Sequence, residues 1–204
     1  MIHIYGDSHA NSSFKNLQLP FVDHHQSNIT MFRIGRDHAI VNYNNTDHDE
    51  NSIICLVYGE IDCRCHIHKQ INLGKKEEEI IYDLVEQYFS TITNQITLFK
   101  KIIIVAAIPP TKRSDYETKH GPITHEYPFM GTDEERVRYT RKLNQLVEHM
   151  CKENQYIYFD PYATYTRDDG TLRFEYSDNT VHLGDTSAFL KEFMEVYQSI
   201  KDVV

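Results

Sequence analysis

The sequence has few cysteines, no apolar stretch as long as a membrane span, and fewer basic than acidic residues. Its cysteines are Cys55, Cys63, Cys65 and Cys151, which form no disulfide framework for a 204-residue chain, so we expect reduced thiols. The missing apolar stretch excludes a transmembrane helix. The 21 Lys and Arg against 30 Asp and Glu give a formal net charge of -9. This balance argues against a nucleic-acid partner, because phosphate-binding proteins gather Lys and Arg on one face.

No secretory leader is visible, because the first residues form an apolar strand pattern instead of a basic and then apolar segment. We therefore expect a cytoplasmic protein without a membrane partner. Hydrophobic residues make up 40% of the chain and charged residues 25%, which is ordinary for a globular domain. The length suits one domain over residues 1–204, and no linker, repeat or low-complexity tract divides it.

Compact apolar runs predict several buried strands. Because these runs do not alternate between apolar and polar residues, they suit a parallel sheet that is covered on both faces. The predicted strands are Ile2–Tyr5, Ile53–Tyr58, Ile102–Ile108 and Tyr156–Phe159, with a weaker one at Thr30–Ile34.

Three segments carry apolar residues at helical spacing. The first is Glu77–Phe99. The second follows Thr132, which forms a capping-box pattern with Glu135, and continues to Met150; the third runs from about Thr186 to the C-terminus. Strands that alternate with such helices predict an α/β fold, with three α/β/α layers around about five strands and right-handed crossovers.

The segment Pro109–Gly131 is polar and aromatic and has neither a helical nor a strand period. Loops of this length in compact domains are usually functional or disordered. Because it follows a predicted strand, we expect it to line a substrate cleft. The alternative is a surface loop or a contact between copies of the chain in a homo-oligomer. The side chains concerned are Tyr116, His120, His125, Tyr127 and Phe129.

Three polar motifs stand where ligands bind in α/β sheets, beyond the carboxyl ends of strands. The motif "YGDSH" follows the first strand, "YGEIDCRCHIH" follows the strand that begins at Ile53, and "YSDNTVHLGD" precedes the last helix. Together, "GDSH", "GEIDCR" and "DNTVHLG" resemble the SGNH, or GDSL, hydrolase superfamily over essentially the whole chain. The resemblance implies a flavodoxin-like three-layer fold and a serine esterase that works through an acyl-enzyme and needs no cofactor.

The resemblance implies that Ser8 is the nucleophile. A serine hydroxyl needs a base to remove its proton, and His182 holds the place of the family's histidine before the last helix. A carboxylate should fix the tautomer of that histidine. The family has Asp three residues before the histidine, where this chain has Asn179. We therefore expect Asp178 to orient His182, with Asn179 as the alternative.

The oxyanion site departs from the family pattern as well. The resemblance implies donors on the Ser8 amide, on a second-block glycine, for which Gly35 is the candidate, and on a third-block Asn. That Asn position holds Ile61, so we expect an arginine, Arg64 or Arg36, to replace the lost donor. The remaining polar side chains are expected to bind the substrate: Asp7, His9, Arg36, Glu60, Asp62, Asn179 and Tyr127.

Each motif also has a simpler interpretation. "GDS" is a favoured turn, His182 can merely cap a loop, and Asp62 and Arg64 can form a surface ion pair. The segment "CRCHIH" offers zinc ligands, but they crowd into one segment, whereas structural zinc sites pair ligands from two, so we predict no metal site. The residues weighed for such a site are Asp23, His24, His25, His48, Asp49, Cys63, Cys65, His66 and His68.

The expected reaction is the removal of a small acyl group, such as acetyl, from a carbohydrate or another polar alcohol, because the site is a strand-end crevice beside a polar, aromatic loop. One alternative keeps the acyl-enzyme but passes the acyl group to a sugar hydroxyl, as in an acyltransferase of polysaccharide metabolism. Another is a non-catalytic carbohydrate-binding module of the same fold, which the departures at Ile61 and Asn179 keep open.

Overall fold

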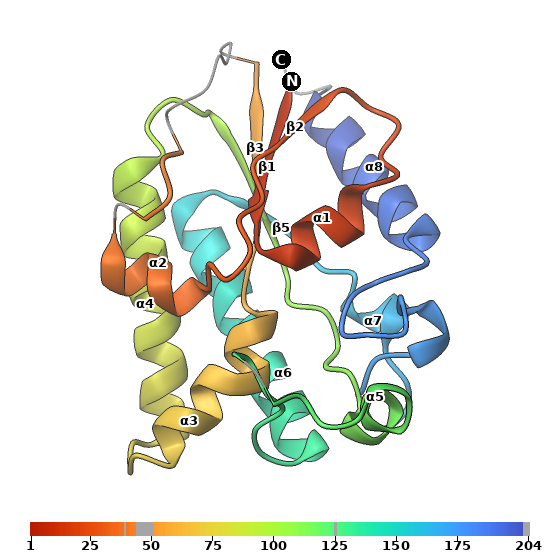
Figure 1. Cartoon of the computed structure of the whole chain (residues 1–204). Coiled ribbons are helices and arrows are strands. Elements are labelled where there is room, and N and C mark those ends of the chain that lie inside the picture. Colours follow the sequence, from red (N-terminus) through yellow and green to blue (C-terminus); the bar gives the residue numbers. More distant parts are fainter. Residues whose placement is uncertain (39, 44–50, 125, 202–204) are drawn as a thin grey trace.

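A parallel sheet of five strands forms the centre of the protein, in the order β2-β1-β3-β4-β5 (Figure 1). The computed structural model describes residues 1–38, 40–43, 51–124 and 126–201. Four of the predicted apolar runs form strands, because strands of a covered parallel sheet bury both faces. The strands are β1 (Ile2–Gly6), β2 (Phe21–Asp23), β3 (Ile53–Val57), β4 (Lys101–Val105) and β5 (Ile157–Phe159).

Helices connect these strands. A π-helical turn, η1 (Asp62–His66), follows β3, and a short 3-10 helix, η2 (Phe174–Tyr176), precedes the last motif. The α-helices are α1 (Ser8–Phe14), α2 (Met31–Asp37), α3 (Ile67–Ile71), α4 (Glu77–Gln95), α5 (Arg113–His120), α6 (Asp133–Asn154), α7 (Tyr162–Tyr165) and α8 (Ser187–Lys201).

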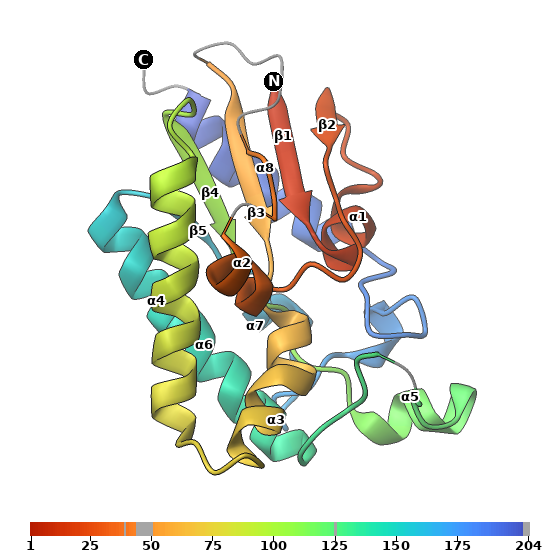
Figure 2. The ribbon, with the colours of Figure 1, turned by 60° about the vertical axis from the view of Figure 1, so that its left-hand side comes forward.

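Both faces of the sheet are covered, which confirms the three-layer α/β/α prediction. Figure 1 shows α2, α4 and α6 on one side and α1 and α8 on the other. Successive residues of β3 point to opposite layers, so Ile54 and Leu56 join the core under α4, whereas Ile53 and Val57 join the core under α8. Figure 2 shows α3 and α5 beyond the carboxyl ends of the strands.

The prediction of a strand at Thr30–Ile34 is wrong, because this segment begins α2. Thr30 caps the helix with its side chain, and the buried Asp62 carboxylate accepts the amide of Met31 at 2.9 Å. Oxygen acceptors at the first amides of a helix stabilise its start. The strand on the outer side of β1 is instead Phe21–Asp23.

The other predicted elements form with shifted ends. The capping box of Thr132 and Glu135 is present at the start of α6. Helix α4 ends at Gln95, before its predicted end, and α8 begins at Ser187. The segment Pro109–Gly131 is not wholly irregular, since it contains α5.

The four cysteines are buried and form no disulfide, as the sequence predicts. Burial raises the pKa of the Cys55 thiol, which keeps it in the neutral form. No helix in the described ranges combines the length and the apolarity that crossing a bilayer requires.

The strand order reverses between β1 and β3, and ligands bind beyond the carboxyl ends of parallel strands at such a point. Both strands end in a glycine turn here. A Cβ on Gly6 would lie 2.5 Å from the Ala10 Cβ, so only glycine lets α1 start this close. Gly59 has a φ of +115°, which glycine adopts without strain. The residues that follow the two turns therefore border one crevice.

Candidate active site

Ser8 is the first residue of α1, directly after the carboxyl end of β1. Asp7 caps this helix by accepting the amide of His9 at 2.8 Å. The amide of Ser8 belongs to the first turn, where N–H groups have no acceptor within the helix. Ser8 therefore offers a hydroxyl and a helix-end amide at the same place.

The imidazole of His182 contacts the Ser8 hydroxyl, with 2.9 Å between His182 Nε2 and Ser8 Oγ. A neutral His182 can accept the Ser8 proton in the tautomer that carries its hydrogen on Nδ1 and leaves Nε2 unprotonated. Burial, followed by the nearby His9, lowers the pKa of His182 to about 4. His182 is therefore a neutral base at neutral pH, and it is aimed at Ser8.

The other side of the His182 ring faces Asp178 and Thr180. His182 Nδ1 lies 3.0 Å from Thr180 Oγ1 and 3.4 Å from Asp178 Oδ2. Thr180 donates its hydroxyl, at 2.5 Å, and its amide, at 2.9 Å, to Asp178 Oδ1. Burial opposes the ionisation of Asp178, but the hydrogen bonds from Thr180 and the nearby His182 together outweigh it and lower the pKa of this carboxyl. The structure thus brings Ser8, His182 and Asp178 together.

A buried charged cluster of His9, Glu60 and Arg64 lies next to this pair. Glu60 Oε2 contacts His9 Nε2 at 2.9 Å and Arg64 Nη2 at 3.2 Å. Burial alone would raise the pKa of Glu60, but Arg64 and His9 lower it to about 2. Burial opposes the protonation of His9, yet the Glu60 carboxylate outweighs it and raises the pKa of His9. The His9 ring, whose centre is 4.6 Å from that of His182, therefore lies between the imidazole of His182 and the Glu60 carboxylate that it contacts.

A cavity of about 290 Å³ opens beside Ser8 and His182. Arg64 borders it with a side chain that is only 9% exposed, and its Nε has no hydrogen-bond partner among the described residues. This nitrogen itself has almost no accessible surface. The lining residues are Ser8, Asn28, Ile61, Arg64, Tyr116, Ile123, Glu126, Tyr127, Thr180, Val181 and His182.

No protein-family model and no curated protein matches the sequence. Solved structures do match the fold. A Bacteroides fragilis protein assigned as an acylhydrolase aligns with a TM-score of 0.62 and 14% identity, over 98% of this chain and 86% of its own. A GDSL-like lipase from Bacteroides thetaiotaomicron aligns with a TM-score of 0.59 and 13% identity, over 100% of this chain and 88% of its own. An acetylxylan esterase from Geobacillus stearothermophilus aligns with a TM-score of 0.59 and 12% identity, over 95% of this chain and 92% of its own. The chain has the SGNH hydrolase fold.

Two residues predicted from the SGNH resemblance do not take their expected places. Gly35 lies within α2, where its amide serves the helix and a Cβ would come 2.9 Å from the Gln87 Cβ on α4. Arg36 is exposed and pairs with Asp37. Neither residue borders the cavity beside Ser8, so the structure does not bring Gly35 or Arg36 to the place that their predicted oxyanion and substrate roles require.

Four residues predicted to bind the substrate of an SGNH enzyme are buried beside the cavity instead of lining it. The Asp62 carboxylate accepts the amides of Met31 and Phe32 and so holds the start of α2, and burial raises its pKa to about 7. Arg64 pairs with Glu60 in the interior, which is not the surface ion pair with Asp62 that the simpler interpretation offered. The four buried residues are Asp7, His9, Glu60 and Asp62.

Asn179 faces α5 and not His182. Its side-chain oxygen accepts a hydrogen bond from Lys119, and its backbone carbonyl lies 2.7 Å from His120 Nε2. Its φ is +71°, a left-handed conformation that Asn tolerates better than most residues. Asn179 therefore connects α5 to the loop that carries His182, and the structure does not place it in the predicted substrate-binding or orienting position.

The aromatic residues of the segment after β4 divide between the cavity and its support. Tyr116 and Tyr127 line the cavity as predicted. Phe129 is buried against Tyr116, and His120 contacts the Asn179 carbonyl, so these two do not line it. His125 lies outside the described residues.

Five lining residues escape prediction from the sequence. Asn28 has a φ of +68° and lies in the loop before α2. Its place in "SNIT" is the available signal, because Asn adopts left-handed turns readily and Thr caps helices. The loop before α2 borders the cavity, whereas Gly35, which lies within the helix, does not. The five residues are Asn28, Ile123, Glu126, Thr180 and Val181.

The residues weighed as metal ligands are dispersed. His66 stacks on Phe32 with ring centres 3.8 Å apart, and His68 Nδ1 lies 3.0 Å from the Tyr139 hydroxyl. In the part of the chain that the structure describes, no three His, Cys, Asp or Glu side chains are arranged to hold an ion. The remaining candidates, His48 and Asp49, lie outside the described residues.

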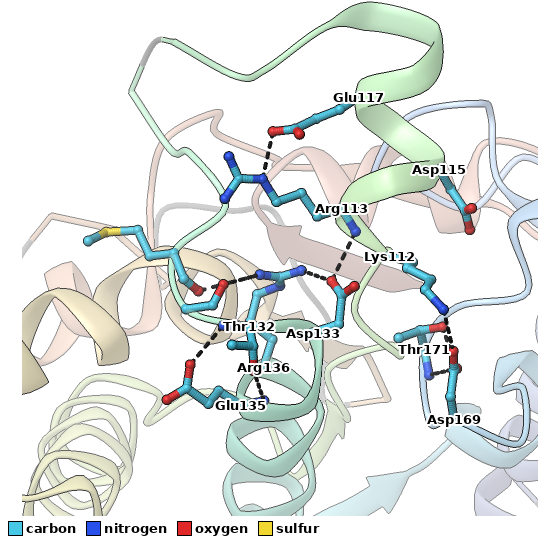
Figure 3. A network of polar contacts seen from close by, with 12 residues as sticks. Lys112, Arg113, Asp115, Glu117, Thr132, Asp133, Glu135, Arg136, Asp169 and Thr171 are labelled. Atoms are coloured by element: carbon cyan, nitrogen blue, oxygen red, sulfur yellow. Dashed lines mark hydrogen bonds and ion pairs between the residues drawn. The ribbon is translucent and has the colours of Figure 1, made fainter.

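A buried arginine holds the end of the wall segment, residues 123–131, which contributes Ile123, Glu126 and Tyr127 to the cavity. Figure 3 shows the polar contacts of this arginine, Arg136. Arg136, on α6, has no exposed surface; it donates to the Gly131 carbonyl at 2.9 Å and pairs with Asp133. The neighbouring Met130 donates its amide to the Arg64 carbonyl at 3.0 Å. Arg136 therefore connects α6 both to the end of the wall segment and to the turn that carries Arg64.

Replacement of Arg136 by methionine is expected to lower the free energy of unfolding by about 2 to 3 kcal/mol, because buried carbonyls lose their donor and Asp133 loses its partner. Urea unfolding measures the change. Arg113→Met is the matched control, since Arg113 pairs with Glu117 at the surface and its removal is expected to cost at most about 0.5 kcal/mol. Equal losses in the two variants contradict the anchoring role.

Proposed function

We propose that the protein is a serine esterase that removes a small acyl group from a carbohydrate or another polar alcohol. The observation that carries the proposal is the 2.9 Å contact between Ser8 Oγ and His182 Nε2 at the edge of a cavity. Asp178 lies behind the imidazole, so the three side chains have the order that activates a serine. The matched acetylxylan esterase structures include catalytic mutants at a serine, a histidine and an aspartate of that enzyme, which supports the same three residue types here.

The proposed reaction has two steps. Ser8 Oγ bonds to the ester carbonyl carbon while its proton moves to His182 Nε2; the bond to the alcohol then breaks, and the alcohol leaves with that proton. Water next attacks the acylated Ser8 and gives its proton to His182. The bond between acyl group and serine breaks, the proton returns to Ser8 Oγ, and a carboxylic acid leaves.

The negative charge that develops on the carbonyl oxygen requires donors. We assign this role to the Ser8 amide, at the first turn of α1, and to the guanidinium of Arg64, a residue that lines the cavity. Ile61 lines the same cavity and has no donor to offer, so the charged Arg64 takes the place of the amide that the family pattern would put there.

An Arg64→Met variant is therefore expected to lose about 10²- to 10³-fold in kcat with a smaller change in KM, because an oxyanion donor acts mainly on the transition state. Steady-state kinetics on one ester give both constants. Since Met also removes the partner of Glu60, Arg64→Met combined with Glu60→Gln separates the effects. An unchanged kcat in Arg64→Met excludes the oxyanion role.

The cavity favours a small acyl group and a polar alcohol. Its volume of about 290 Å³ lies at the lower limit for ligand pockets. Pockets for drug-sized molecules reach volumes several times larger. Tyr116 and Tyr127 offer ring faces, and Glu126 offers a hydrogen-bond acceptor for hydroxyl groups. The fold match to an acetylxylan esterase supports a carbohydrate ester as substrate.

Hydrolysis of p-nitrophenyl acetate, butyrate and octanoate, together with acetate release from an acetylated oligosaccharide, tests the proposal. We expect kcat/KM to fall with acyl length and acetate to be released from the sugar. Transfer of acetyl to an added sugar in preference to water identifies an acyltransferase instead. Binding of the oligosaccharide without any ester cleavage identifies a binding module and contradicts the esterase.

A further inference from the structure

The oxygen closest to His182 Nδ1 belongs to a hydroxyl and not to a carboxylate. Thr180 Oγ1 lies 3.0 Å from Nδ1, which is a hydrogen-bond distance, whereas Asp178 Oδ2 lies at 3.4 Å, beyond the usual range for an N–H donor to a carboxylate. Thr180 is therefore in direct contact with the base. Asp178 stands four residues before His182, one residue more than in the family pattern.

Only one pattern of donors satisfies these three groups. The hydroxyl of Thr180 has a single proton, and its 2.5 Å contact with Asp178 Oδ1 has the length of an O–H donor to an ionised carboxylate. The Thr180 oxygen then keeps lone pairs to accept the Nδ1 hydrogen of His182. The same tautomer leaves Nε2 unprotonated toward Ser8, so the chain of hydrogen bonds runs without conflict from carboxylate to nucleophile.

We propose that Thr180 is a positioning residue through whose hydroxyl Asp178 orients His182. The inference rests on the proposed esterase function and adds a fourth residue to its machinery. When His182 takes the Ser8 proton, the dipole of the Thr180 hydroxyl stabilises the positive charge of the imidazolium. The charge of Asp178 orients and polarises this hydroxyl. Hydroxyl and carboxylate then act as one unit on the base.

The hydroxyl can be removed without removing the turn that carries it. The amide of Thr180 also donates to Asp178 Oδ1, at 2.9 Å, and this bond needs no side chain. Valine has the shape of threonine without the oxygen, so Thr180→Val keeps the turn and deletes the bridge, whereas Thr180→Ser restores the hydroxyl.

The test compares kcat on p-nitrophenyl acetate among variants of the whole chain. Thr180→Val is expected to lose about 10- to 100-fold in kcat with little change in KM, and Thr180→Ser to recover most of it. Ser177→Ala is the matched control: the Ser177 hydroxyl bonds within the same loop, to the Phe174 carbonyl and the Asn179 amide, and its loss is expected to leave kcat nearly unchanged.

A double-mutant cycle with Asp178→Asn reveals whether the two residues act in series. If Asp178 acts through Thr180, the double variant is about as slow as the slower single variant; losses that multiply overturn the inference. It is also overturned if Thr180→Val keeps the wild-type kcat, if Thr180→Ser is no faster than Thr180→Val, or if Ser177→Ala loses as much. A wild-type protein that cleaves no ester contradicts the proposed function, and the inference with it, whereas an active wild type with an equally active Thr180→Val contradicts the inference alone.

Discussion

Replacement of Ser8 by alanine is expected to reduce kcat for ester hydrolysis by at least about 10⁴-fold, because no acyl-enzyme can form without the hydroxyl. The variant removes one oxygen from the first turn of α1 and leaves the Asp7 cap in place. Its folding should therefore match that of the wild type. The measurement is kcat on p-nitrophenyl acetate, with thermal unfolding run in parallel.

Ser12→Ala is the control for this variant. Ser12 lies one turn further along α1, and its hydroxyl donates to the Ser8 carbonyl at 2.8 Å without facing the base. Its removal is expected to leave kcat close to the wild-type value. A Ser8→Ala variant that stays within a factor of about ten of wild-type kcat would show that another group attacks the ester.

Replacement of His182 by alanine is expected to lower kcat by about 10³- to 10⁴-fold, since Ser8 loses the base that takes its proton and the acid that protonates the leaving alcohol. His149→Ala is the control, because His149 is an exposed residue that pairs with Glu153. Steady-state kinetics at neutral pH compare the two. Similar losses in both variants would remove His182 from the mechanism.

The pH profile of the wild type follows from the same residue. The base works only when it is neutral, so kcat/KM falls as His182 takes up a proton. Because burial lowers the pKa of His182 to about 4, we expect kcat/KM to stay level from about pH 7 to about pH 5 and to fall below that. An acid limb near the ordinary histidine pKa of about 6.5 contradicts this environment for His182.

Much of the fold is predictable because long apolar runs carry their own signal. The runs at Ile2, Ile53 and Ile102 become strands, and the capping box at Thr132 starts α6. The errors occur where a distant residue decides. The sequence after Thr30 is equally compatible with a strand. It forms α2, and the carboxylate that accepts the first amide of this helix belongs to Asp62, 31 residues further along the chain. The edge strand β2 has only three residues, which is too short for a period to appear.

The site divides in a similar way. Ser8, His182 and Asp178 stand in motifs at strand and helix ends, so a family pattern locates them. The departure at Ile61 pointed to Arg64 or Arg36, and of these two Arg64 lines the cavity. The burial of Glu60 against His9 could not be predicted, because the two residues are 51 positions apart and meet only after β1 and β3 pair. The misplacement of Gly35 has the same cause as the missed helix, since its role depended on where α2 begins.

Labelling with a serine-directed fluorophosphonate, followed by peptide mapping, tests the central claim most directly. The account predicts one modified residue, Ser8, and much slower labelling of the His182→Ala variant, because the phosphonate reacts with a hydroxyl whose proton His182 accepts. Labelling at another residue, no labelling of the wild type, or equal rates with and without the His182 imidazole would contradict it.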